Sequence, residues 1–164
     1  MAKLLQHVAN VNWFPFRIGS EYLRVEIPRY FNQEYNSQKH NNGCWRVDGG
    51  FALFVTLEGG VYVDAATGKQ LSQGFAECDA KNGIDQCFVW VSQNSSGLNK
   101  HGQRTPKSTE ILSGVDLHLF VRETRKVGSR TAPFTYHGIY TAEHYSDLGP
   151  KQAMICKLYG ANHD

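Results

Sequence analysis

The sequence has no long apolar run and no segment of the signal-peptide type. A membrane-spanning helix needs about 20 consecutive apolar residues, and no stretch of this chain approaches that length. The first seven residues pass from Leu4 and Leu5 directly into Gln6 and His7, without an apolar h-region or a small-residue cleavage site. We therefore expect a cytoplasmic protein without a membrane partner.

Cysteine is scarce and is not arranged for metal binding. The four cysteines are Cys44, Cys78, Cys87 and Cys156, and none of them forms a C-x-x-C pair. Their spacing matches neither a zinc knuckle nor a zinc ribbon. The pattern predicts free, partly buried thiols and no metal site.

Catalytic motifs are also missing. The chain contains no G-x-S-x-G elbow and no Walker loop. Residues 138–140 read Gly-Ile-Tyr, as at the start of a GIY-YIG nuclease motif, but no Tyr-Ile-Gly follows. Asp116, Glu123 and Lys126 have the residue types of a metal-dependent nuclease, yet strand alternation would send the acid and the lysine to opposite faces. The sequence predicts no enzyme activity and no cofactor.

The formal net charge of +2 is the sum of opposed blocks. Residues 1–47 carry +3 and residues 91–130 carry +4, whereas residues 48–90 carry −4 and residues 131–164 carry −1. Such segregation is typical of a protein that turns one face toward a polyanion. The alternative is that folding interleaves the blocks.

Short runs with a period of two, bounded by Gly, Asn and Asp, recur along the chain and predict β structure. Residues 51–57 place Phe51, Leu53, Val55 and Leu57 on one face, and residues 117–122 alternate in the same way. The 164 residues suffice for one domain, 1–164. We expect a mainly β fold, an open or closed pseudobarrel of about seven strands with one or two short helices. The expected strands are residues 22–27, 51–57, 61–64, 87–92, 117–122, 134–140 and 153–158, and the expected helices are residues 28–35 and 141–146.

Three polar stretches contain the side chains suited to nucleic acid. Residues 92–109 are almost wholly amide, hydroxyl and cationic, residues 122–130 predict a basic hairpin tip, and residues 36–46 add further amides and cations. Amides and arginines read base edges, and lysines and arginines contact phosphates. A solvated loop is the alternative for each stretch. The candidate DNA-binding residues are Lys39, His40, Asn41, Asn42, Arg46, Gln93, Asn94, Ser95, Ser96, Asn99, Lys100, His101, Gln103, Arg104, Lys107, Arg125, Lys126 and Arg130.

Within this set two roles are expected. Gln93 and Asn94 follow a strand closely and carry both a donor and an acceptor, so we expect them to specify bases. Lys126 and Arg130, on a hairpin with a Gly-Ser tip, should mainly position the DNA backbone. The alternative for Gln93 and Asn94 is that they brace the barrel.

Aromatic side chains are core residues by default. Trp90, however, lies just before Ser92 and Gln93. We therefore expect its ring to form the bottom of the site in which the loop that follows binds its ligand. Trp45, Trp90 and Tyr136 are the candidate base pocket, because an extruded base is held by stacking between such rings.

Several of these segments together resemble a known family. They are residues 88–96, 102–103, 117–123 and 132–138, with weaker likeness in residues 22–27, 53–57 and 62–64. The combination of residues 90–94 with residues 119–123 is the more specific part. The chain resembles, over about residues 20–159, the C-terminal domain of unknown function that follows a phospholipase-D-type nuclease and a superfamily-two helicase in bacterial modification-dependent restriction enzymes.

The resemblance implies that the chain recognises double-stranded DNA, with a modified base as one target, while nuclease and helicase domains or subunits cut and translocate. Residues 25–28 before a short helix are also similar to the opening of the pseudobarrel DNA-binding domain shared by plant auxin-response-type factors and some restriction endonuclease effector domains. Two other functions stay open: a protein-interaction β-barrel with solvated loops, and single-stranded nucleic-acid binding on exposed aromatics.

Overall fold

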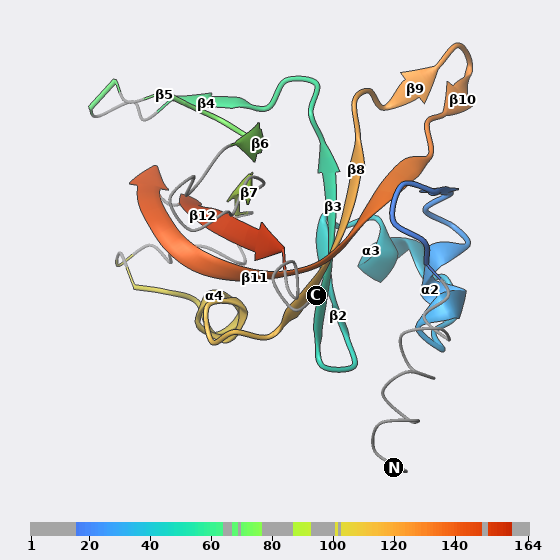
Figure 1. The fold of residues 1–164 in the computed structure, drawn as a ribbon, viewed down its shortest axis with the longest axis horizontal. Helices are drawn as coiled ribbons and strands as arrows, with labels where there is room; N and C mark the ends of the chain where they lie inside the picture. The colour runs from blue at the N-terminus through green and yellow to red at the C-terminus, as the bar shows by residue number, and fades with distance from the viewer. Residues whose placement is uncertain are drawn as a thin grey trace.

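The computed structural model describes residues 16–63, 67–68, 70–76, 87–92, 101, 103–148 and 151–158. These residues form a mainly β fold with three short helices, drawn in Figure 1. The elements are β1 (Glu21–Tyr22), α2 (Ile27–Tyr30), α3 (Ser37–His40), β2 (Cys44–Val47), β3 (Gly50–Thr56), β4 (Val61–Val63), β5 (Gln70–Ser72), β6 (Gly74–Ala76), β7 (Cys87–Val91), α4 (Pro106–Ile111), β8 (Asp116–Arg122), β9 (Lys126–Val127), β10 (Arg130–Thr131), β11 (Phe134–Leu148) and β12 (Lys151–Leu158).

One curled sheet dominates the fold. Its strands lie in the order β2-β3-β8-β11-β12-β7-β6, with β1 paired to β11. The β3–β8 pair is parallel, and the other pairs of this sheet are antiparallel. The sheet is curled (Figure 1). The separate β4–β5 hairpin links β3 to β6, and its ladder is extended by the Gln73 N–H, which donates to the Gly60 carbonyl at 2.8 Å. The predicted mainly β open pseudobarrel is confirmed.

The long strand β11 makes the curl possible (Figure 1). Its pairing with β8 shifts register between Tyr136 and Gly138, and its pairing with β12 shifts between His144 and Ser146. Gly138 has a φ of 105°, a conformation that side chains disfavour. Such bulges bend a strand and increase its twist. The predicted helix at residues 141–146 is wrong, because this segment continues β11 and pairs with β12.

The concave face of the sheet carries the first core, and alternation along β3 and β8 builds it. Phe51, Leu53 and Val55 share this core with Leu117, Leu119 and Val121, and Leu57 packs against it, as predicted from their common faces. Helix α4 closes one end of the curl with Ile111, which is fully buried.

The opposite face of β2, β3, β8 and β11 carries the second core, which is rich in aromatic rings. Phe54, Phe120 and Phe134 lie here, and the N-terminal segment covers them with Phe16 and Ile27. Burying side chains on both faces explains why β3 is almost wholly apolar, with Thr56 at its end as its polar residue.

The N-terminal covering segment differs from the sequence prediction. Only Glu21 and Tyr22 are strand residues, because the Leu23 N–H donates to the Glu26 side chain and the Glu26 N–H donates to the Leu23 carbonyl, which forms a turn. The helix at Pro28 is confirmed, but it ends at Tyr30 rather than at residue 35. Asn32, with a φ of 57°, reverses the chain at that point.

Two of the three polar stretches contain short helices. The Asn36 side chain accepts hydrogen bonds from the Gln38 and Lys39 N–H groups and begins α3. Thr105 accepts from the Ser108 N–H and begins α4, with Pro106 in its first turn. Strand β2 then includes Arg46. The polar stretches at residues 36–46 and 92–109 are therefore partly regular structure.

Two cysteines, Cys44 and Cys87, differ in oxidation state. Cys44 is a free buried thiol, and burial raises its pKa to about 12. Cys87 is disulfide-bonded, so the prediction of a free thiol is wrong for this residue. In the part of the chain that the structure describes, no helix combines the length and apolar character needed to cross a membrane.

Candidate nucleic-acid interface

Two adjoining hollows open between the N-terminal segment, the end of β3 and the β9–β10 hairpin. The smaller, of about 500 Å³, is the arginine pocket; its lining includes Arg24, Arg122, Arg125, Gln73, Tyr62 and Trp90. The larger, of about 1390 Å³, is the groove; its lining includes Leu23, Val25, Phe75, Val127, Arg130 and His137. Arg24, Asn41 and Arg122 line both hollows. These three residues therefore stand at the boundary between them.

Arg24 is held in place on two sides. Its Nη1 donates to the His40 carbonyl at 2.9 Å and to the Asn42 carbonyl at 3.2 Å. Its guanidinium carbon lies 5.0 Å from the ring centres of both Phe54 and Phe134. Burial first, and the charge of Arg122 second, lower the pKa of Arg24 to about 10, so the group stays cationic at neutral pH.

Arg122 ends strand β8 and is fixed in a similar way. Its Nε donates to Thr56 Oγ1 at 2.9 Å, its Nη1 donates to the Ala132 carbonyl at 3.2 Å, and its guanidinium carbon lies 4.3 Å from the Phe134 ring centre. Burial lowers its pKa, and the neighbouring charge of Arg125 lowers it further. Arg24, Arg122 and Arg125 thus line one pocket, where Arg122 is close enough to affect Arg24 and Arg125 is close enough to affect Arg122.

The basic hairpin predicted at residues 122–130 is present. Strands β9 and β10 pair antiparallel, with Lys126 opposite Thr131 and Arg130 opposite Val127. Gly128 at the tip has a φ of 64°, which the turn requires. The side chains of Arg125, Lys126 and Arg130 are exposed. Figure 1 shows the hairpin projecting from the body of the protein.

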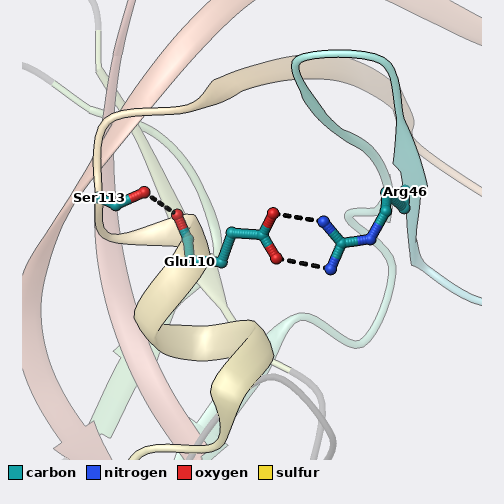
Figure 2. Close-up of polar contacts among 3 residues, drawn as sticks. All are labelled: Arg46, Glu110 and Ser113. Atoms are coloured by element: carbon teal, nitrogen blue, oxygen red, sulfur yellow. Dashed lines mark hydrogen bonds and ion pairs between the residues drawn. The ribbon is translucent and has the colours of Figure 1, made fainter.

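The second predicted group of cations lies elsewhere. Figure 2 shows Arg46 of β2 facing Glu110 of α4 through two parallel hydrogen bonds, and Ser113 Oγ donating to the Glu110 carbonyl at 2.5 Å. Lys107 donates from Nζ to the Cys44 carbonyl at 2.7 Å. Both Arg46 and Lys107 lie against the Phe51 ring. In Figure 1, strand β2 and helix α4 lie on the opposite side of the protein from the β9–β10 hairpin. The structure therefore does not bring Arg46 and Lys107 together with Arg125, Lys126 and Arg130.

The candidates on and after α3 have separate environments. His40 is buried: its Nδ1 accepts from the Asn36 N–H at 2.8 Å and its Nε2 lies 2.9 Å from Gln33 Oε1. The structure therefore places His40 in the interior rather than at a surface. Asn41 lies at the boundary of the hollows, where its Oδ1 accepts from Tyr35 at 2.7 Å. Two further candidates are exposed: Lys39, whose Nζ donates to Gln33, and Asn42, whose amide donates to the Gln38 and Lys39 carbonyls.

The remaining loop candidates are only partly described. His101, Gln103 and Arg104 are exposed. The predicted contacts of Gln93, Asn94, Ser95, Ser96, Asn99 and Lys100 lie outside the described residues. These residues follow β7, whose last residue, Val91, lines the arginine pocket.

The three aromatic candidates for a base pocket do not share one site. Trp90 is buried in the first core and lines the arginine pocket. Trp45 and Tyr136 are buried in the second core. Tyr136 OH lies 3.1 Å from His118 Nδ1, and Trp45 Nε1 has no hydrogen-bond partner among the described residues. The ring that joins Trp90 at the pocket is Tyr62.

Sequence reasoning left Arg24, Arg122, Gln73 and Tyr62 out of the candidate site. A signal was present for two of them: Arg24 stands alone between Leu23 and Val25, and Arg122 ends an apolar strand on the face of Phe120. A cation at such a position needs a special environment. For Gln73 no motif marks the segment, and for Tyr62 the weak likeness of residues 62–64 gives no sign of a binding role.

Within the described ranges, no three His, Cys, Asp or Glu side chains are grouped so that they could hold a metal ion. The polar side chains at the two hollows carry guanidinium, amide and hydroxyl groups, together with the imidazole of His137 and the carboxylates of Glu58, Glu21 and Glu123. Guanidinium and amide groups bind anions and base edges.

Comparisons with known proteins give one structural similarity. No protein-family model and no curated protein matches the sequence. The fold is similar to a solved structure described as a modification dependent TagI restriction endonuclease, with a TM-score of 0.46 and 16% sequence identity over 89% of this chain. This chain covers 51% of that protein, about half its length. At this score and identity, the similarity carries no inference about function.

Proposed function

We propose that this chain is a recognition domain for double-stranded DNA. The observation that carries the proposal is the arginine pocket, which is lined by Arg24, Arg122 and Arg125 beside an exposed basic hairpin; the charge of Arg122 acts on Arg24, and that of Arg125 acts on Arg122. Among the described residues, neither Arg24 nor Arg122 forms an ion pair with a carboxylate. A surface with uncompensated cations gains free energy when a polyanion covers it, because phosphates replace unfavourable like-charge contacts.

The roles in the proposed complex follow from how firmly each side chain is held. Arg125, Lys126 and Arg130 are exposed on the hairpin and supply phosphate contacts. Asn41 and Gln73 are held by hydrogen bonds to Tyr35 and to the Val91 N–H, so they present amide groups in defined positions. Gln93 and Asn94, next along the chain from Ser92, remain the predicted base readers.

Trp90 and Tyr62 give the arginine pocket its aromatic lining. We propose that a base, modified or not, is read at this pocket by ring contacts combined with the Gln73 amide. Trp45, Tyr136 and His40 are not part of the proposed interface, because they are buried in or against the second core.

The biological setting of the proposal comes from the sequence resemblance. The chain is proposed to act in the cytoplasm as the target-recognition part of a restriction or defence system, with nuclease and helicase domains or subunits as partners. It has no catalytic role of its own in this proposal.

The test is retention of a random duplex pool by the purified chain at two salt concentrations, followed by selection from a random duplex library with and without cytosine methylation. We expect retention that weakens steeply with salt and resists single-stranded competitor. An absence of retention at low salt, or displacement by single strands at equal concentration, overturns the proposal.

The groove favours a second candidate function, protein interaction. Its rim exposes apolar side chains, including Val127 at 66% and Val25 at 56% exposure. Exposed apolar surface around a hollow is typical of a partner-binding site. In this case the Val25→Ser and Val127→Ser variants would leave duplex binding unchanged while abolishing association with the partner.

A further inference from the structure

The arginine pocket contains an unusual cluster of fixed positive charge. The guanidinium groups of Arg24 and Arg122 both contact the buried ring of Phe134, which holds the two cations against one platform. Contact with an aromatic face orients a guanidinium and removes part of its water. Both groups are therefore preorganised rather than mobile.

The hydrogen bonds of the two arginines leave donors unused. Arg24 donates through Nη1 alone, and Arg122 donates through Nε and Nη1. Within the described part of the chain, Arg24 Nε and Nη2 and Arg122 Nη2 have no acceptor. All the acceptors in use are neutral carbonyl or hydroxyl oxygens, which do not neutralise the charge.

The charge balance distinguishes the two hollows. The groove has two carboxylates, Glu21 and Glu123, among its lining residues. The arginine pocket has the three arginines against the single carboxylate of Glu58. With Arg130, the groove has three arginines against its two carboxylates, so the larger excess of positive charge belongs to the arginine pocket. Asn41 lines it as well, and among the described residues its side-chain amide uses only Oδ1, as an acceptor from Tyr35.

We infer that the arginine pocket is a binding site for one phosphate group, held by Arg24, Arg122 and Arg125 with Asn41 as a further donor. Planar guanidinium groups match phosphate oxygens in pairs. The inference deepens the proposed function and rests on it only for the source of the phosphate, which is the DNA backbone beside the base-reading site. Free phosphate has the same chemistry, and the experiment separates the two sources.

The first arm uses inorganic phosphate as the probe at constant ionic strength, with binding to the full chain measured by calorimetry and by the rise in melting temperature. We expect Arg122→Gln and Arg125→Gln to weaken phosphate binding at least five-fold, and Arg122→Lys to weaken it by a smaller factor because it keeps charge but loses the planar donor pair. Arg29→Gln removes one exposed cation from α2 and serves as the charge-matched control, with binding unchanged.

Arg122→Gln also removes contacts to Thr56 and Ala132, so its effect alone is open to a stability explanation. Arg125→Gln answers this, because the Arg125 side chain is exposed and its substitution should not lower the melting temperature without phosphate. If Arg125→Gln and Arg29→Gln alter phosphate binding equally, the inference is wrong.

The second arm measures duplex binding by the same variants and its competition by phosphate. Loss of duplex affinity in Arg122→Gln and Arg125→Gln, with competition in the unmodified chain, supports a backbone phosphate. Phosphate binding that depends on the arginines without any duplex binding supports a free phosphate ligand and overturns the proposed function alone. Duplex binding that neither variant weakens, together with phosphate binding that does not depend on the arginines, overturns the inference and leaves the proposed function standing.

Discussion

Two regions of this protein place cations over a buried phenylalanine ring, and they use those cations differently. At the β2–α4 end, Arg46 and Lys107 lie against Phe51, and each has a defined partner, the Glu110 carboxylate and the Cys44 carbonyl. At the hairpin end, Arg24 and Arg122 lie against Phe134 beside another arginine, Arg125. The β2–α4 end is neutralised at Arg46, whereas the hairpin end keeps excess positive charge.

The comparison shows that a count of cations does not locate a binding surface. Arg46 is exposed, like the hairpin cations, with 58% of its side chain accessible. Its two outer nitrogens, however, are hydrogen-bonded to the Glu110 carboxylate. Arg24 is more buried, yet its charge has no carboxylate partner in the described chain. Whether a carboxylate neutralises a cation, rather than how exposed the cation is, distinguishes the structural cations from those available to a ligand.

The largest expected effect comes from the two phenylalanine platforms. Phe134→Ala and Phe51→Ala each remove a fully buried ring and should each lower the free energy of unfolding by about 3–5 kcal/mol, measured by urea unfolding. The two variants should differ in duplex binding by the folded protein, because Phe134 orients the arginine pocket and Phe51 does not. Equal losses of duplex affinity would contradict the division into two regions. Phe134→Leu, which keeps much of the apolar volume, is the milder companion variant.

The next effect is a pH dependence of the second core, which supports the hairpin end. Burial lowers the pKa of His118 from its ordinary 6.5 to about 4. The unfolded chain therefore binds the extra proton between these pH values, and stability is retained above pH 6.5 and lost as pH falls toward 4. The loss should reach about 3 kcal/mol at the acid end, from about 1.4 kcal/mol per pH unit.

Urea unfolding at several pH values checks this expectation. Burial also lowers the pKa values of His40 and His137, so their protonation adds to the slope in the same direction. His118→Gln isolates the His118 share: the slope of stability against pH should flatten in this variant. An unchanged slope would mean that His118 does not carry the acid sensitivity.

The salt dependence of duplex binding distinguishes the two groups of cations directly. Replacing Arg125, Lys126 and Arg130 together by Gln should reduce the slope of log affinity against log salt by about 2.7, from about 0.9 per phosphate contact. Replacing Arg46 and Lys107 by Gln should change the slope by less than about 0.5. If the second pair flattens the slope as much per charge as the hairpin set, the β2–α4 end also faces the DNA. Titrations between 50 and 200 mM salt suffice for this measurement.

The smallest effect concerns the Arg46–Glu110 pair. The hydrogen bonds from Arg46 lower the pKa of Glu110, so the pair stabilises the fold above the ordinary carboxyl pKa and loses this contribution as pH falls through the lowered one. Glu110→Gln should reduce the melting temperature at pH 7 by on the order of 1 °C, because the pair is solvent-exposed. The difference from the unmodified chain should vanish once the pH is below the lowered pKa of Glu110. A difference that persists there would assign the effect to helix α4 itself.

Alternation of apolar residues in the sequence was sufficient to predict the central strands. Strands β3 and β8 form where the pattern indicated, with Phe51 and Leu117 on the predicted faces. The pattern was insufficient where a local hydrogen bond competes with strand formation, as at Leu23 and Glu26. It was also insufficient in the second half of β11, where pairing with β12 decides the conformation of a segment whose own sequence is ambiguous.

The candidate site could be predicted in part. The basic hairpin with Lys126 and Arg130 follows from local charge and turn residues, and it is present. The grouping of Arg46 with the hairpin could not be tested from sequence, because the identity of its partner, Glu110, depends on how α4 packs beside β2.

The sequence by itself determined the β class, the two faces of the central strands and the position of the basic hairpin, because these depend on patterns within a few neighbouring residues. Only the tertiary structure decided which cations have partners. Arg24 and Arg122 lie far apart in the chain, yet the pairing of β1 and of β8 with β11 beside Phe134 brings both guanidinium groups onto that ring. Electrostatic interaction depends on distance in space and on burial, and neither quantity exists until the chain has folded.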